Sequence, residues 1–576
     1  MKIIKKEKAL FSIAIILLTY FYWQIHGKFG FIPRDEARVL GLAQRISNGE
    51  IPHRDFMYQT LMGSAYLHYF HLLIPSFNVQ IQRIVSILMF QGYSLLLLNL
   101  SDKYKSLDIF SKILLFAIST ILNIHYYEFT IWPTIDGIFV IALGSLLIFK
   151  YKKYNIFGFL MIGLSPLFKT PFYVSVFFIV VFSTVIIEKF SFENFIKKSF
   201  ISGLPTIMYI LYISAYGGFT KLIEETVNQP SYKWELVNSW IHHLGFYEKR
   251  LIPLSLLLVL LITLQLKNKE NVLKLSLFSL VTMAFIINIL DFGSMTYKPI
   301  INLLNLFFCF IFFVKFFKKK YPDTFIAFVV CYSIEFGAMM SVGWRYGLYV
   351  SGTVLVLILI SVINFEVIAK KISEKSRFTQ NSSAIKNLLI PVLFILVFLI
   401  PIKDMILFQW NYIYVDKPRE ELVFNLNDLE SERYGNIYTS NTVYKYLESI
   451  EYCLDKYDTK RISIFPDNPL LYFIYDLENP IPVDWMGASV QMTQDYYPRR
   501  IKEVIDSPGY VGSIILLQSY KVSKLPTIDI NKIDMVNEDP FPDYVQEVYR
   551  DLYDYLRDRE NTEIDYCKSF TVLINN

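Results

Sequence analysis

Charged residues are scarce in this 576-residue chain, at 19% of the sequence, whereas hydrophobic residues make up 54%. Soluble globular proteins carry about 25% charged residues. This shortage argues against an ordinary soluble protein, and together with a mean hydropathy of +0.38 it predicts a polytopic α-helical membrane protein. The basic residues stand in short clusters between apolar runs, a pattern that gives no support for nucleic-acid binding.

Cysteine is also scarce, and the four cysteines show no CxxC or zinc-type spacing. Cys309 and Cys331 fall in apolar runs, where we expect small core residues. Cys453 and Cys567 share the C-terminal segment, and the sequence leaves open whether they form a disulfide. The chain has no convincing internal repeat, and its C-terminal part has no GxGxxG motif, P-loop or metal-ligand spacing.

No small-residue cleavage site follows the first apolar run, although four lysines precede it. We therefore expect an uncleaved first span with a cytoplasmic N-terminus. Fourteen apolar runs occur near residues 9–25, 60–74, 79–99, 109–124, 135–149, 154–168, 171–187, 199–216, 251–266, 272–290, 299–317, 323–341, 345–368 and 388–410. The run 60–74 is short and contains His68 and His71, so it is predicted to be an interfacial helix rather than a span.

The positive-inside rule then fixes the orientation. All the lysine- and arginine-rich connections become cytoplasmic if the run 60–74 does not cross. About 13 transmembrane helices result, in the plasma (inner) membrane, with the C-terminal segment outside. The long outer loops 26–78 and 217–250 are rich in aromatic and polar residues, which is typical of functional loops rather than linkers.

Charge divides the chain into two predicted domains. Residues 1–410 carry a net charge of +17 and form the membrane module, whereas residues 411–576 carry a net charge of −12. Hydrophobic patterning predicts a small extracytoplasmic α/β domain in the second part, with a recognition or support role. Its expected strands are 461–465, 513–518 and 569–574, and its expected helices are 441–455, 498–506 and 543–557.

Several charged residues would meet at the outer face in this topology. Asp35 and Glu36 directly follow the first span, Asp136 begins a later span, and Lys169 and Arg345 lie at further span ends. A charge beside a membrane span is costly unless it is solvated, paired or functional. A carboxylate there can act as a base, and fixed cations can stabilise a departing phosphate. Each residue also has a structural interpretation, because the carboxylates can cap helices and the cations can extend to the interface.

The order of these motifs resembles that of the GT-C glycosyltransferases of the protein O-mannosyltransferase and aminoarabinose (lipid A) transferase type. The matching segments are Arg34-Asp35-Glu36-Ala37, Asn48-Gly49-Glu50-Ile51-Pro52-His53-Arg54-Asp55, Arg83, Asp136-Gly137-Ile138-Phe139 and Leu167-Phe168-Lys169-Thr170-Pro171. The resemblance covers roughly residues 1–200. It departs from the family at Gln59-Thr60-Leu61-Met62-Gly63, where relatives often have Pro-Pro-Leu, and in the Lys169 turn, where the family's glycine is replaced.

The resemblance implies transfer of a sugar, with inversion, from a polyprenyl-phosphate donor to a lipid, glycan or protein acceptor on the outer face of the membrane. In this interpretation Asp35 is the base, Glu36 supports it, and Asp136 is a second acid in the cavity. Lys169 and Arg345 would bind the donor phosphate. The candidates for substrate contact are Arg34, His53 and Tyr58. Some branches of the family use a divalent metal and others do not, and this sequence assigns no metal ligand.

Three other functions compete with this interpretation. A lipid-linked sugar transporter would need charges near the bilayer midplane and an internal repeat. A polysaccharide polymerase or ligase would need neither the Asp35-Glu36 pair after the first span nor the C-terminal domain. In a non-enzymatic membrane scaffold the acidic pair would be incidental.

Overall fold

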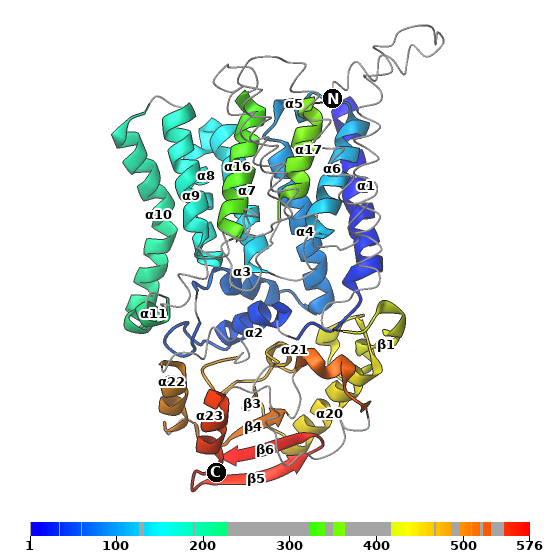
Figure 1. The fold of residues 1–576 in the computed structure, drawn as a ribbon, viewed down its shortest axis with the longest axis vertical. Coiled ribbons are helices and arrows are strands. Elements are labelled where there is room, and N and C mark those ends of the chain that lie inside the picture. The colour runs from blue at the N-terminus through cyan, green and yellow to red at the C-terminus, as the bar shows by residue number, and fades with distance from the viewer. Residues whose placement is uncertain are drawn as a thin grey trace, which may run out of the picture.

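The computed structural model describes residues 2–33, 35–58, 60–125, 132–187, 190–226, 322–339, 349–362, 416–465, 468–484, 496–507, 510–518, 522–530 and 547–575. Figure 1 shows three layers. A bundle of long helices forms the upper layer, and two shorter helices, α2 and α3, lie across its lower end. The C-terminal α/β domain forms the third layer below them, so the two ends of the chain lie at opposite ends of the molecule.

The upper layer is built from the apolar runs of the sequence. Its long helices are α1 (Lys2–Tyr22), α4 (Val79–Leu98), α6 (Ile109–His125), α7 (Pro133–Phe149), α8 (Asn155–Phe168), α9 (Phe172–Val181), α10 (Phe192–Ala215), α16 (Pro322–Met339) and α17 (Ser351–Val362). Shorter elements beside them are the π-helical turns η1 (Trp23–Gly27) and η3 (Phe182–Ile187), the 3-10 turn η2 (Lys152–Tyr154), α5 (Asp102–Lys105) and α11 (Phe219–Thr226).

Among the described residues, two helical stretches, Lys8–Gly27 and Val79–Leu98, are long and apolar enough to cross a membrane. The pair Pro133–Phe149 and Lys152–Phe168 passes the same test together but is bent by 118°, which adds a third span if the pair counts as one. The count of 13 spans therefore stays a prediction. The predicted spans near 251–266, 272–290, 299–317 and 388–410 lie outside the described residues, as does loop 217–250 beyond Thr226.

Large apolar side chains point outward from the bundle. Ile16 and Leu17 of α1 are 65% and 61% exposed, and Met208 and Leu211 of α10 are 68% and 63% exposed. Inside the bundle, α7 and α8 touch at the backbone, because a Cβ on Gly144 would lie 2.7 Å from the carbonyl oxygen of Gly158. Close approach at small residues is typical of helices that pack in lipid.

The middle layer consists of α2 (Asp35–Ser47) and α3 (Gly63–Leu72). The predicted interfacial run 60–74 forms α3, whose ten residues extend about 15 Å, half the thickness of a bilayer core. It lies across the lower ends of the upright helices (Figure 1), as an interfacial helix would.

The C-terminal domain contains a sheet in the order β3-β4-β6-β5, in which β3 and β4 are parallel and the remaining neighbours are antiparallel. Its strands are β3 (Ile462–Phe465), β4 (Ser513–Gln518), β5 (Thr562–Cys567) and β6 (Phe570–Asn575), and β1 (Phe424–Asn425) pairs separately with β2 (Tyr438–Thr439). Its helices are α20 (Asn441–Tyr457), α21 (Leu470–Ile474), α22 (Tyr496–Ile505) and α23 (Glu547–Arg557). Its 3-10 turns are η5 (Arg419–Glu421), η6 (Leu426–Asp428), η7 (Glu432–Tyr434) and η9 (Val522–Thr527).

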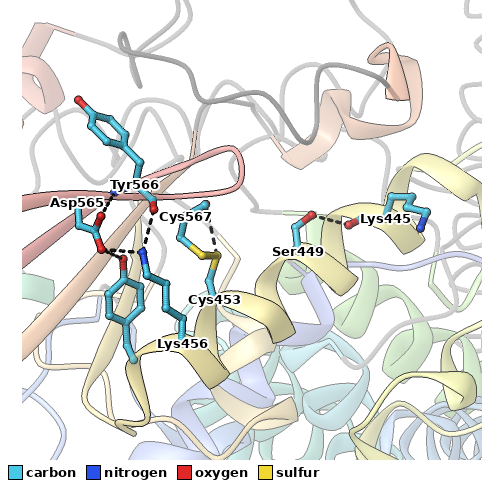
Figure 2. The surroundings of a disulfide bond; sticks show 8 residues. Lys445, Ser449, Cys453, Lys456, Asp565, Tyr566 and Cys567 are labelled. Atoms are coloured by element: carbon cyan, nitrogen blue, oxygen red, sulfur yellow. Dashed lines mark hydrogen bonds and ion pairs between the residues drawn. A yellow bond between two sulfur atoms is a disulfide. The ribbon is translucent and has the colours of Figure 1, made fainter.

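A disulfide settles the pairing that the sequence left open. Cys453 of α20 is bonded to Cys567 at the end of β5, across 114 residues of sequence, as Figure 2 shows. Beside it, Asp565 Oδ2 accepts hydrogen bonds from Lys456 Nζ at 2.7 Å and from the Tyr457 hydroxyl at 2.8 Å. The bond and these contacts fix the long helix of the domain to the edge of its sheet.

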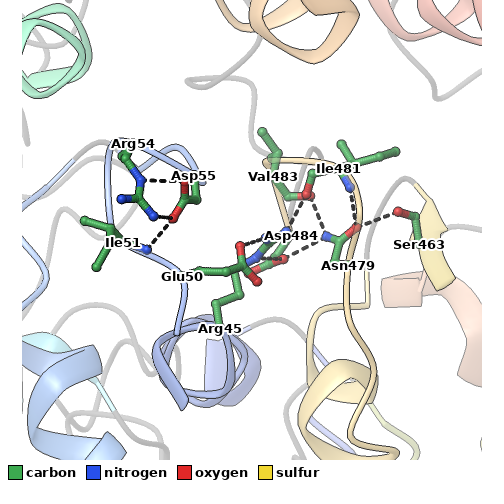
Figure 3. Close-up of polar contacts among 10 residues, drawn as sticks. All are labelled: Arg45, Glu50, Ile51, Arg54, Asp55, Ser463, Asn479, Ile481, Val483 and Asp484. Atoms are coloured by element: carbon green, nitrogen blue, oxygen red, sulfur yellow. Dashed lines mark hydrogen bonds and ion pairs between the residues drawn. The ribbon is translucent and has the colours of Figure 1, made fainter. Parts of the chain in front are cut away.

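Helix α2 joins the two parts of the chain. Its residues Ala37, Val39 and Leu40 are buried in one hydrophobic cluster with the core of the C-terminal domain. Figure 3 shows the polar side of this contact, where Arg45 Nε lies 2.7 Å from Asp484 Oδ1 and Arg45 Nη1 lies 2.6 Å from Glu50 Oε2. The C-terminal domain therefore supports the helix that carries the predicted base.

Candidate functional site

Glu36, the second residue of α2, forms a buried ion pair with Arg83 in the first turns of α4. Arg83 Nε lies 2.5 Å from Glu36 Oε1, and Arg83 Nη2 lies 2.9 Å from Oε2. The same guanidinium donates to the carbonyl oxygens of Gly27 and Gly30, each at 2.8 Å. A two-pronged pair fixes orientation as well as charge. Glu36 therefore anchors the first turn of α2, of which Asp35 is the first residue; the Asp35 side chain and Arg34 lie outside the described part.

Arg38 stands three residues after Asp35, on the same face of α2. Its Nε donates to the Tyr58 hydroxyl, and its guanidinium carbon lies 4.9 Å from the centre of the Tyr58 ring. Tyr58 is itself buried, and its backbone N–H donates to Glu225 Oε2 at 3.2 Å. The structure thus places Tyr58, a predicted substrate residue, so that it positions an arginine absent from the predicted site.

Lys169 lies in the turn between α8 and α9. Its Nζ donates to Thr134 Oγ1 at 3.1 Å and to the carbonyl oxygen of Ala338 at 2.9 Å. Within the described part of the chain, Lys169 forms no ion pair. Burial and, to a smaller extent, the positive charge of Arg38 lower the pKa of Lys169 to about 7. The charge of Arg38 therefore disfavours the ammonium form of Lys169, and an anion near both groups would favour that form.

The predicted donor residue Arg345 lies outside the described residues. Described residues on either side of the Arg345 segment, Ala338 and Tyr349, contact Lys169. The carbonyl of Ala338 accepts from Lys169 Nζ, and the centre of the Tyr349 ring lies 5.9 Å from the same nitrogen. The assignment of Arg345 to a phosphate stays a prediction.

Asp136, in the first turn of α7, is 1% exposed. Its Oδ2 accepts from Ser64 Oγ at 2.7 Å and lies 3.1 Å from His68 Nε2. Both partners belong to α3, so Asp136 joins α7 to the interfacial helix. Because Thr134 of the same turn bonds Lys169, the start of α7 contacts both α3 and the turn that carries the cation.

A close backbone contact holds α3 against that turn. A Cβ on Gly63 would lie 2.7 Å from the carbonyl carbon of Leu167, two residues before Lys169. A Cβ on Gly137 would overlap the ring of Phe172, at the start of α9. These glycines permit α3, α7 and the Lys169 turn to meet at the site.

His53 belongs to a neighbouring cluster. It is 1% exposed and has a positive φ of 63°. Its Nδ1 lies 2.6 Å from Glu225 Oε2, and its Nε2 lies 3.0 Å from the Tyr209 hydroxyl. Burial raises the pKa of Glu225, and the bond to His53 opposes the shift. The hydroxyl of Tyr496, in the C-terminal domain, also reaches Glu225 at 3.4 Å. The described contacts of His53 thus tie the first loop to α10 and α11, and Glu225 extends the cluster to α22.

The predicted residues therefore separate into groups. Tyr58 contacts Arg38 on α2, the charge of Arg38 acts on Lys169, and Asp136 adjoins Lys169 through Thr134 of α7. Glu36 and His53 hold the surrounding segments in place. The described residues contain no group of three or more His, Cys, Asp or Glu side chains that could hold a metal ion.

The site thus combines a buried lysine in the α8–α9 turn with Arg38 of α2, a helix that begins with Asp35. Comparison with known proteins adds no identification, since no protein-family model and no curated protein matches the chain.

Proposed function

We propose that this protein is a membrane glycosyltransferase that moves a sugar from a polyprenyl-phosphate-linked donor to a lipid, glycan or protein acceptor on the outer face of the membrane. The observation that carries the proposal is the buried ammonium of Lys169, which hydrogen-bonds Thr134 and Ala338 but forms no ion pair among the described residues. The positive charge of Arg38, on α2, acts on it as well. A desolvated lysine with a second cation near it suits a phosphate.

Two features support a membrane location and an outer-face site. Exposed Ile16, Leu17, Met208 and Leu211 on opposite sides of the bundle suit contact with lipid. The Cys453–Cys567 disulfide suits an oxidising compartment, where such bonds persist. Because the disulfide-bonded domain packs directly on α2, it brings the candidate site to the same side of the membrane.

The proposed reaction is a single displacement. The acceptor hydroxyl oxygen forms a bond to the anomeric carbon of the donor while the bond from that carbon to the phosphate oxygen breaks. Asp35 takes the hydroxyl proton, and the phosphate leaves with its electron pair toward Lys169 and Arg38, with Arg345 as a further predicted partner. The Glu36–Arg83 pair keeps the first turn of α2, and with it Asp35, in position.

A transfer assay tests this proposal directly. Purified full-length protein in lipid nanodiscs would be incubated with radiolabelled polyprenyl-phosphate sugars and a membrane extract as the source of acceptors. We expect labelled product with wild type and a loss on the order of 10²-fold in Lys169→Ala. Lys152→Ala is the matched control, because Lys152 is an exposed lysine in η2, the turn that precedes α8. Equal rates in the two lysine variants would contradict the assignment of Lys169 to the donor phosphate. Movement of the donor across the bilayer without product would indicate a transporter.

A further inference from the structure

The buried carboxylate Asp136 is connected to a pair of histidines on α3. His68 Nε2 lies 3.1 Å from Asp136 Oδ2, and His68 Nδ1 lies 3.0 Å from His71 Nδ1. The two imidazole rings are 4.9 Å apart between centres and nearly perpendicular, at 77°. Carboxylate, first imidazole and second imidazole therefore form one continuous chain of hydrogen-bonding atoms.

The residues around this hydrogen-bonded series favour one placement of the imidazole hydrogens. Because the Asp136 carboxylate accepts, His68 carries its hydrogen on Nε2, and its Nδ1 offers a lone pair. The Gln82 amide nitrogen lies 3.1 Å from that Nδ1, and the Gln82 carbonyl oxygen lies 3.3 Å from His71 Nδ1. His71 therefore carries its hydrogen on Nδ1, directed to both acceptors.

The exposure of the side chains increases from Asp136 to His71. Asp136 and His68 are 1% and 0% exposed, whereas His71 in the last turn of α3 is half-buried. Just beyond it Leu73 is 62% exposed, so α3 reaches the surface of the molecule at this end. Burial, and then the charge of His68, lower the pKa of His71. Two positive rings at 3.0 Å repel one another, so the pair holds one extra proton more readily than two.

The groups that surround the Asp136–His68–His71 series allow a proton to enter or leave it. Asp136 faces it from α7, and neutral Gln82 faces it from α4. Arg83, the next residue on α4, is directed to Glu36. Phe77, whose ring centre is 5.8 Å from that of His71, adds no charge.

We propose that His68 and His71 form a two-imidazole relay that exchanges the proton of Asp136 with solvent at the end of α3. Asp136 in its acid form gives a proton to His68 Nε2 while His68 gives its Nδ1 proton to His71 Nδ1. His71 then releases its Nε2 proton to water. One proton leaves the carboxyl group, one enters solvent, and both imidazoles end neutral in the arrangement that the hydrogen bonds favour. The relay rests on the proposed function in one respect, namely that sugar transfer uses Asp136 as an acid or base.

The variants His71→Gln and His71→Ala test the relay in the transfer assay. Glutamine keeps a hydrogen-bonding side chain but does not titrate, and we expect it to slow transfer on the order of 10²-fold and to change the pH profile. Added imidazole should restore His71→Ala and leave Lys169→Ala unchanged. A merely structural contact between α3 and α7 predicts no rescue by imidazole. A wild-type rate and pH profile in His71→Gln would overturn the relay.

A second measurement does not depend on activity. The full-length protein labelled with ¹⁵N-histidine would be titrated by NMR. We expect the titration step of His71 to move to higher pH in His68→Gln, because the charge of His68 lowers the pKa of His71. An unchanged His71 step in His68→Gln would show that the two rings are not coupled and would overturn the relay. Inactive wild type with coupled titration would instead reject the proposed function and leave the proton pathway standing.

Discussion

The unusual environment of Lys169 makes binding of a phosphate ligand dependent on pH. The free site holds the Lys169 pKa at about 7, because of burial and the nearby Arg38 charge. A phosphate beside the ammonium would favour its charged form and raise that pKa. Binding therefore takes up a proton above pH 7, and affinity should fall as pH rises. Arg38 stays charged throughout this range, so it contributes no slope.

The size of the effect follows from the pKa. If only the ammonium form binds, raising the pH from 7 to 9 weakens the apparent affinity by about 50-fold. A phosphate monoester does not titrate in this window, since its second pKa is about 6. The free protein should respond in the opposite way. Between pH 7 and the ordinary pKa of a lysine, the unfolded chain holds more protons at Lys169 than the folded protein does. The contribution of Lys169 to folding stability therefore increases with pH across that window.

The assay is fluorescence anisotropy with a labelled short-chain polyprenyl phosphate and the full-length protein in detergent. Lys169→Met should bind weakly with no slope between pH 7 and 9, whereas Lys169→Arg should keep affinity and lose the slope. Lys152→Ala, altered at the exposed lysine of η2, should match wild type. A flat wild-type profile, or the same slope in Lys169→Met, would refute the reasoning.

Three further predictions concern the framework around the site. Glu36→Gln should lower the free energy of unfolding by about 3–5 kcal/mol, because it leaves the Arg83 cation buried without its counter-charge. Chemical denaturation measures this change. The Glu36→Gln/Arg83→Met double variant should lose less stability than the sum of the two single variants. Cys453→Ser should destabilise the C-terminal domain by about 2–4 kcal/mol, and an unchanged melting temperature in non-reducing buffer would contradict the role of the disulfide. A reporter fused after Asn576 should report the outer side of the membrane, and a cytoplasmic signal would reverse the topology.

Local pattern was sufficient to predict several elements of the C-terminal domain. Strand Ser513–Gln518 matches its prediction because a continuous apolar run is buried on both faces. Helix α20 (Asn441–Tyr457) matches the helix predicted over 441–455, although the residue at its N-cap position is Ser440. Strand Thr562–Cys567 was missed, since it is polar, lies at the edge of the sheet, and is defined by its pairing with β6.

The candidate site was harder to predict because its contacts join distant segments. The sequence shows that Arg38 follows Asp35 by three residues, but the effect of its charge on Lys169 depends on tertiary packing. His68 was interpreted as a polar residue of an interfacial helix, whereas its bond to Asp136 spans 68 residues. Glu36 was assigned a supporting role, but its partner Arg83, 47 residues away, was not. The roles of Asp35, Arg34 and Arg345 stay predictions.

The central claim is that α2 presents a catalytic base to a phosphate-bound sugar donor. Single-turnover transfer by Asp35→Asn in nanodiscs tests it most directly, with Asp551→Asn, an exposed carboxylate in α23, as the matched control. We predict that Asp35→Asn loses on the order of 10²- to 10⁴-fold in rate while it still binds the polyprenyl phosphate, and that Asp551→Asn is unaffected. Transfer by Asp35→Asn at the wild-type rate would contradict the account.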